Sequence, residues 1–191
     1  MKSLTNKKPS KDKRKALLKA LIYKKVLKGE LPLEAVMGSS GIQAYLIILL
    51  IKFLLNNLDE EKFTLLSNEL SFLYKKAFWE NLDIAIFEKE KVKPYLMQNE
   101  FIPVVPKVVI KVDTEADLSR YGGVEEYVHE KTQDLLDADV EKVIWIFTKP
   151  KKVMITKKGK KWIVKDWKDD FEVIDEIKVN LNEILKNSKE V

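Results

Sequence analysis

The sequence contains no cysteine and a single histidine, His129. Without thiols the chain has no disulfide framework, no thiolate zinc site and no cysteine nucleophile. One histidine also argues against a histidine-rich metal centre and a Ser-His-Asp triad. The longest apolar run, from Ala44 to Leu55, is interrupted by Lys52 and is too short to span a bilayer. The basic N-terminus lacks the apolar segment of a signal peptide, so we expect a cytoplasmic protein without a membrane partner.

Positive charge is concentrated at one end of the chain. Residues 1–28 contain eleven Lys or Arg and one acid, Asp12, whereas the other 163 residues carry 24 basic and 29 acidic groups. We therefore expect a basic N-terminal arm and helix over residues 1–30 and a single domain over residues 31–191. Such an arm could bind phosphates through counterion release, or it could be a solvated tail followed by a lysine-rich helix.

Hydrophobic periodicity predicts an alternating order of helices and strands. Helices are expected over 10–27, 42–56, 124–138 and 181–185, and strands over 82–87, 107–113, 142–148, 152–156 and 161–166. The helix over 42–56 is apolar on nearly every side, so we expect it inside the core. One helix between two strands predicts a right-handed crossover. The fold class is therefore α/β or α+β, with a mixed central sheet flanked by helices.

Three charged residues occur in or beside apolar strands, where a charge is costly unless it is paired or hydrated. Asp83 opens the strand over 82–87, and Lys111 and Asp113 lie in the strand over 107–113. Because Lys111 and Asp113 are two residues apart, their side chains leave the same face of the strand. We expect these three residues to cluster across adjacent strands.

These residues belong to segments whose order resembles a known family. The segments are Met37-Gly-Ser-Ser-Gly-Ile-Gln43 before a helix, Leu82-Asp83-Ile-Ala-Ile-Phe87, Val109-Ile-Lys-Val-Asp-Thr114, and Lys131 on a helix followed by Val140-Glu-Lys-Val-Ile-Trp-Ile-Phe147. Between about Leu31 and Leu185 the chain resembles the Uma-two family of restriction-endonuclease-like proteins, a branch of the PD-(D/E)XK nucleases.

The resemblance implies a nucleic-acid partner and a magnesium site. In these nucleases the Asp of the first strand and the acid of the second bind divalent ions, which polarise the phosphate and activate water. The resemblance implies that Lys131 is the lysine that supports catalysis, and that Gln43 faces the active site from its helix. This chain departs from the family at Lys111, which stands where the family has Glu. A metal would then depend on Asp83 together with Asp113 or Glu115.

Three functions fit these residues. The first is a metal-dependent endonuclease that uses Asp83, Asp113 and Lys131. The second is a non-catalytic nucleic-acid-binding module of the same fold, in which Lys111 neutralises Asp83. The third is a self-associating module whose apolar helix over 42–56 contributes to a homodimer.

Structural roles fit the same residues. Asp83 could be a strand-start carboxylate, Lys111 and Asp113 an edge-strand surface pair, Lys131 a solvated helical lysine, and Gln43 a residue that caps or packs against its own helix.

Overall fold

The computed structural model describes residue 25 and residues 39–75, 78–99, 101–113 and 124–188. The chain divides into two units, residues 1–40 and residues 41–191, and the fold below is that of the second. Its elements are α2 (Gly41–Asn57), β1 (Phe63–Lys75), β2 (Phe78–Glu88), α3 (Lys89–Val92), η2 (Lys93–Tyr95), β3 (Val108–Asp113), α4 (Val124–Asp137), β4 (Lys142–Phe147), β5 (Lys152–Lys157), β6 (Ile163–Asp166), β7 (Phe171–Ile174), β8 (Ile177–Val179) and α5 (Leu181–Asn187). Apart from Lys25, the helix expected over 10–27 lies outside the described residues.

The described strands form one mixed sheet and one small hairpin. The main sheet has the order β1-β2-β3-β4-β5-β6, and β7 pairs with β8 separately. Only β3 and β4 run parallel, and α4 lies between them in sequence, as the predicted crossover requires. The mixed sheet flanked by helices confirms the predicted fold class.

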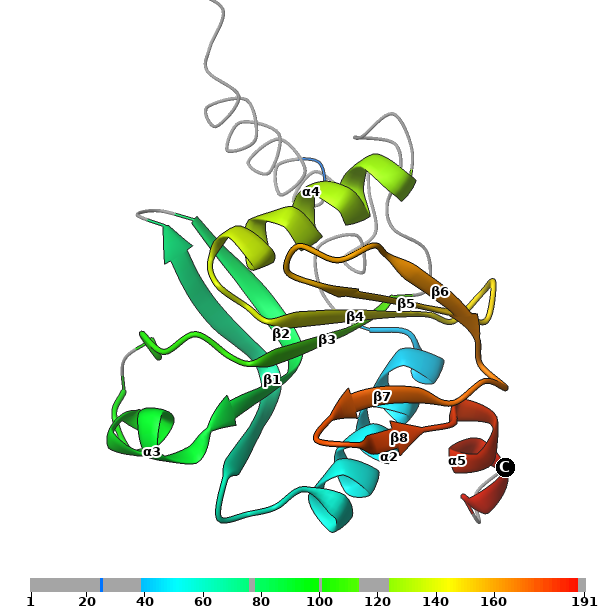
Figure 1. Ribbon diagram of the computed structural model, residues 1–191, viewed down its shortest axis with the longest axis horizontal. Coiled ribbons are helices and arrows are strands. Elements are labelled where there is room, and N and C mark those ends of the chain that lie inside the picture. Colours follow the sequence, from blue (N-terminus) through cyan, green and yellow to red (C-terminus); the bar gives the residue numbers. More distant parts are fainter. Residues whose placement is uncertain (1–24, 26–38, 76–77, 100, 114–123, 189–191) are drawn as a thin grey trace, which may run out of the picture. The chain divides into compact units, whose positions relative to one another are not determined.

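Helix α4 lies over one face of the main sheet, and α2, the β7–β8 hairpin and α5 lie over the other (Figure 1). Each face carries its own hydrophobic layer. On one face, Ile84, Ile86 and Ile110 pack with α2, the β7–β8 hairpin and α5. On the other, Ala85 and Val109 pack with the buried side of α4. This alternation follows from the two-residue period of a strand. It places the odd-numbered side chains of β3, Lys111 included, on the α4 face.

Helix α2 is buried along one stripe only. Leu46, Leu50 and Leu54 are fully buried at four-residue spacing, whereas Ile48 is 62% exposed. The expectation that this helix lies in the core rather than at the surface is therefore correct for one side of the helix and wrong for the other. The sheet covers one side of α2, and apolar residues on the other side stay at the surface. No helix in the described part of the chain is long and apolar enough to cross a membrane.

Three strands, β1, β7 and β8, have no counterpart among the strands predicted from the sequence. In β1 the ladder with β2 shifts register after Ser67, and Asn68 has a positive φ of 73°. This irregularity breaks the alternation by which a strand is recognised. The β7–β8 hairpin turns through Asp175 and Glu176, with φ of 44° and 66°. A turn with two positive φ angles normally contains Asn or Gly, so its usual sequence signal is missing.

Candidate functional site

The candidate site lies where the pairing between β2 and β3 ends. Their ladder pairs Ile86 with Val108 and ends at Ile84 with Ile110. Val112, two residues beyond Ile110 on β3, is not paired with β2 in this ladder. Its N–H instead donates to Oδ2 of Asp83 at 2.7 Å, and its carbonyl accepts from Nε2 of Gln43 at 2.9 Å.

The two side chains replace the hydrogen bonds that a continued strand would supply. A buried backbone group without a partner is costly, which gives Asp83 and Gln43 a structural role at this point. Ser67 adds a third contact, since its Oγ donates to the Asp83 carbonyl at 2.7 Å. Gln43 reaches β3 from α2, so the proposal that it only caps or packs against its own helix is wrong.

A cluster of three charged side chains lies on the α4 face of the same strands. Lys111 Nζ donates to the carbonyl oxygen of Asn81 and lies 3.6 Å from Oε1 of Glu80. Lys131, on α4, donates to Oε2 of the same carboxylate. The side chains of Lys111, Glu80 and Lys131 are only 12%, 7% and 17% exposed. We call these three residues the Glu80 cluster.

Aromatic packing positions the Glu80 cluster. The Trp145 ring, buried on β4, has its centroid 6.0 Å from Lys111 Nζ and stacks on Phe147. The Trp145 indole N–H donates to Oγ1 of Thr132 at 2.9 Å. Thr132 follows Lys131 on α4, so this bond helps to hold the helix at the distance from which Lys131 reaches Glu80.

The structure thus groups the predicted site residues in two sets. Asp83 and Gln43 bind Val112, whereas Lys111 and Lys131 meet at Glu80. Asp113 is half-buried at the end of β3, and Glu115 lies outside the described residues. Two of the structural alternatives are also wrong: β3 is an inner strand rather than an edge, and Lys131 is paired rather than solvated.

Glu80 is the site residue that sequence reasoning missed. It lies three residues before Asp83 on β2, and its burial at 6% exposure is unusual for an acid. The available signal was indirect. Lys111 was expected in an apolar strand and so needed an acidic partner, but Asp83 and Asp113 were the acids considered for it.

The donor set does not fit a divalent ion. Among the described residues, no group of three or more His, Asp or Glu side chains is arranged to hold a metal. Lys111 places an ammonium group, rather than a carboxylate, on the α4 face of β3. Both oxygens of Glu80 are engaged by lysines, and one oxygen of Asp83 is engaged by Val112. The magnesium site therefore remains a prediction that depends on residues beyond these.

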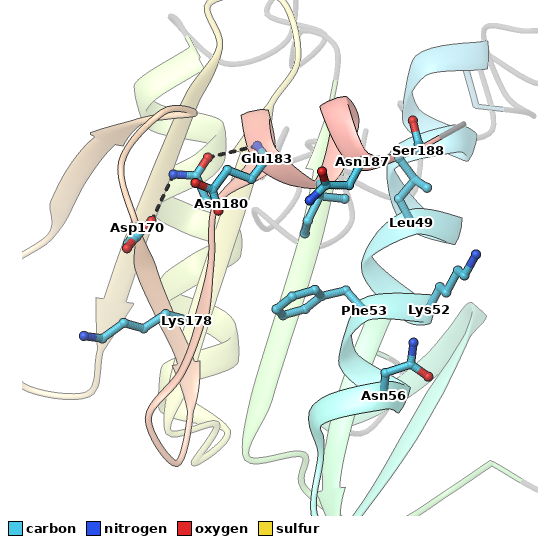
Figure 2. A pocket seen from close by; sticks show the side chains of 11 residues that line it. Leu49, Lys52, Phe53, Asn56, Asp170, Lys178, Asn180, Glu183, Asn187 and Ser188 are labelled. Carbon is cyan, nitrogen blue, oxygen red and sulfur yellow. Dashed lines mark hydrogen bonds between the residues drawn. The ribbon is translucent and has the colours of Figure 1, made fainter. Parts of the chain in front are cut away.

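An open cleft lies on the opposite face of the sheet. Figure 2 shows Leu49, Lys52 and Phe53 on the α2 side of the cleft and Lys178 and Asn180 on its other side, with the Phe53 ring directed across it. Its volume is about 320 Å³. The Asn180 side chain bonds Asp170 at 2.9 Å and caps α5 by accepting from the Glu183 N–H. None of the predicted site residues lines this cleft.

Away from the Glu80 cluster, a buried lysine joins the small hairpin to the main sheet. Lys142, at the start of β4, donates to the Val173 carbonyl at 2.6 Å and to Oε1 of Glu172 at 2.9 Å. Burial lowers the pKa of Lys142. The hydrogen bond from Lys142 in turn lowers the pKa of Glu172. This pair is a structural tie, and its protonation links stability to pH.

Comparison with known proteins finds likeness in structure rather than in sequence. No family model and no curated protein matches the chain. Among solved structures, the chain is similar to "a putative nuclease belonging to DUF820" from Anabaena variabilis, with a TM-score of 0.61 at 12% identity. The match covers 78% of this chain and 83% of that one. At this identity the likeness shows that the two proteins share a fold.

Proposed function

We propose that this chain is a nucleic-acid-binding protein of nuclease-like fold that binds without a divalent metal and does not cleave. The proposal rests on the Glu80 cluster, in which one buried carboxylate pairs with two lysines. In it, Lys111 occupies the strand position at which a metal-dependent site would need an acid, and its ammonium is already paired with Glu80. A dication brought beside this ammonium would be repelled.

The fold supports the choice of partner. The similar solved structure is described as "a putative nuclease", and nucleic acid is what a nuclease would contact. The sequence adds a concentrated source of positive charge in residues 1–28, with eleven Lys or Arg against one acid. Basic groups that neutralise phosphates release counterions, which supplies affinity without sequence recognition or metal.

Fluorescence anisotropy of labelled duplex DNA, single-stranded DNA and RNA tests the proposal with the full chain. We expect the same Kd in magnesium and in chelator at constant ionic strength, and an affinity that falls steeply with salt. Absence of binding to all three ligands at low salt would overturn the proposal, and so would binding that requires magnesium.

Charge-neutralising variants identify the surface involved. Changing Lys11, Lys13 and Lys15 together to Gln should weaken binding and flatten the salt dependence by up to about 0.9 in log–log slope for each phosphate that the arm no longer neutralises. The control changes three exposed lysines of the second unit, Lys160, Lys161 and Lys168, to Gln. If the control loses as much affinity as the arm variant, net charge rather than the arm provides binding.

Metal-dependent cleavage by Asp83, Asp113 and Glu115, with Lys131 as the supporting charge, is the competing function. It predicts activity in magnesium or manganese that Asp83→Ala abolishes. Self-association through α2 is separate from both, and native mass measurement distinguishes a monomer from a homodimer.

A further inference from the structure

We propose that the outer edge of β6 binds an extended acidic segment of a partner protein as an additional strand of the main sheet. Among the described strands, β6 ends this sheet and pairs only with β5. An unpaired strand edge presents free backbone N–H and C=O groups, and another extended chain can complete it by pairing with them. The inference goes beyond the proposed function and does not depend on it, because its ligand is a peptide.

Backbone hydrogen bonds around β6 show which groups face outward. The Trp167 N–H donates to the Lys151 carbonyl at 3.2 Å, so it points toward the β5 side. Backbone groups alternate in direction along an antiparallel strand, so those of Asp166 and Val164 point away from β5. The Asp166 N–H donates to Oδ2 of Asp169 at 3.0 Å, which closes that end of the edge. The open backbone groups are therefore those of Val164.

Both faces of the sheet are uncovered at this edge. Ile163 is 53% and Val164 is 63% exposed, although consecutive strand residues point to opposite faces. Val164 pairs with Met154 and so lies on the α4 face, where Trp162 stacks on His129 with ring centroids 5.2 Å apart. An added strand would cover both exposed apolar side chains, and their burial would stabilise the complex. We therefore expect apolar residues at consecutive positions of the bound segment.

The charge beside the open edge selects the partner. Lys160 and Lys161, in the turn that leads into β6, are exposed, and their side chains have no acidic partner among the described residues. Acidic residues that flank the apolar part of a bound segment would pair with them. A second copy of this chain fits less well, because antiparallel pairing centred on Val164 would place Lys168 opposite Lys160 of the other copy. Like charges directly opposite each other destabilise a ladder.

Fluorescence anisotropy of a synthetic peptide tests the inference with the full chain. The probe is fluorescein-labelled Asp-Glu-Val-Ile-Val-Glu-Asp. One control peptide has its three central amides N-methylated, which removes the N–H groups that would donate to β6, and the other replaces the four acidic residues by lysine. We expect saturable binding of the probe and at least about tenfold weaker binding of either control.

Variants of β6 test the same contact from the protein side. Val164→Pro removes the outward N–H, which makes no bond to β5, and proline is tolerated at such edge positions. We expect it to weaken probe binding about tenfold, whereas Val164→Ile, which keeps the N–H, should bind within about twofold of the wild type. Lys161→Glu should also weaken binding, and Lys52→Glu, which makes the same charge change on α2, should not. Circular dichroism shows whether each variant is folded. If Val164→Pro does not fold, the N-methylated peptide tests the same hydrogen bonds.

Three results would overturn the inference. The first is no saturable binding of the probe up to about 1 mM. The second is a folded Val164→Pro protein that binds the probe as the wild type does. The third is equal affinity for the probe and its N-methylated form, since the lysines would then bind any anion, single-stranded DNA included, without use of the strand edge.

Discussion

Replacing Glu80 by Gln removes the carboxylate that pairs with both Lys111 and Lys131. At an effective dielectric of about 20, the attraction across the 3.6 Å between Lys111 Nζ and Glu80 Oε1 is about 5 kcal/mol. Glu80 makes a second such contact, while relief of its own desolvation offsets part of the loss. Breaking a buried pair by removing one partner costs about 3–5 kcal/mol, and we expect that range for Glu80→Gln.

Urea unfolding, followed by tryptophan fluorescence and circular dichroism, measures this cost. The matched background carries Lys111→Met and Lys131→Met, in which Glu80 is a buried acid without its two lysines. There Glu80→Gln should be neutral or stabilising, because no pairing is removed. The reasoning fails if Glu80→Gln costs less than about 1 kcal/mol in the wild type, or costs the same in both backgrounds.

Three further changes test the layers around the site. Leu50→Ala should cost about 2–5 kcal/mol in urea unfolding because Leu50 is fully buried, whereas Ile48→Ala on the exposed side of α2 should cost less than about 1 kcal/mol; equal costs would contradict the one-sided burial of this helix. Thr132→Val should cost about 1–3 kcal/mol, because it leaves a buried indole N–H without its acceptor, and an unchanged urea midpoint would show that this bond is dispensable. Lys142 lowers the pKa of Glu172 below its ordinary value of 4.5, so the stability from this pair is present above that pH and is lost as pH falls through the folded-state pKa. Glu172→Gln should therefore lose less stability than the wild type below about pH 4.5. If the free energies of unfolding of the two proteins, measured against pH, fall in parallel, the pair does not link stability to pH.

Much of the architecture was accessible from local pattern. The apolar strands around Ile84 and Ile110 and the helical spacing of α4 identified the centre of the sheet and its crossover. These elements are regular, so that their side-chain period reports their conformation. The pattern failed where the backbone is irregular, as at the bulge near Asn68 and at the Asp175–Glu176 turn.

Sequence reasoning named several residues that the structure places around β2 and β3, and their functional role stays a prediction, but it did not give their pairing. Asp83, Gln43, Lys111 and Lys131 were all identified from sequence, yet the partner shared by the two lysines, Glu80, was not. Asp83 lies within β2, and whether its carboxylate meets an ammonium or a backbone amide depends on where the pairing of β2 with β3 ends, which is a tertiary property. A break in the ladder after Ile84 leaves Val112 to be satisfied by Asp83. Nothing in the local sequence marks that break.

In the proposed function, the Lys111 ammonium keeps a divalent metal out of this site. The most direct test is incubation of plasmid, single-stranded DNA and RNA with the wild-type chain across a titration of magnesium and manganese, with Asp83→Ala alongside. We expect no cleavage by the wild type at any metal concentration. Metal-dependent cleavage by the wild type that disappears in Asp83→Ala would contradict it.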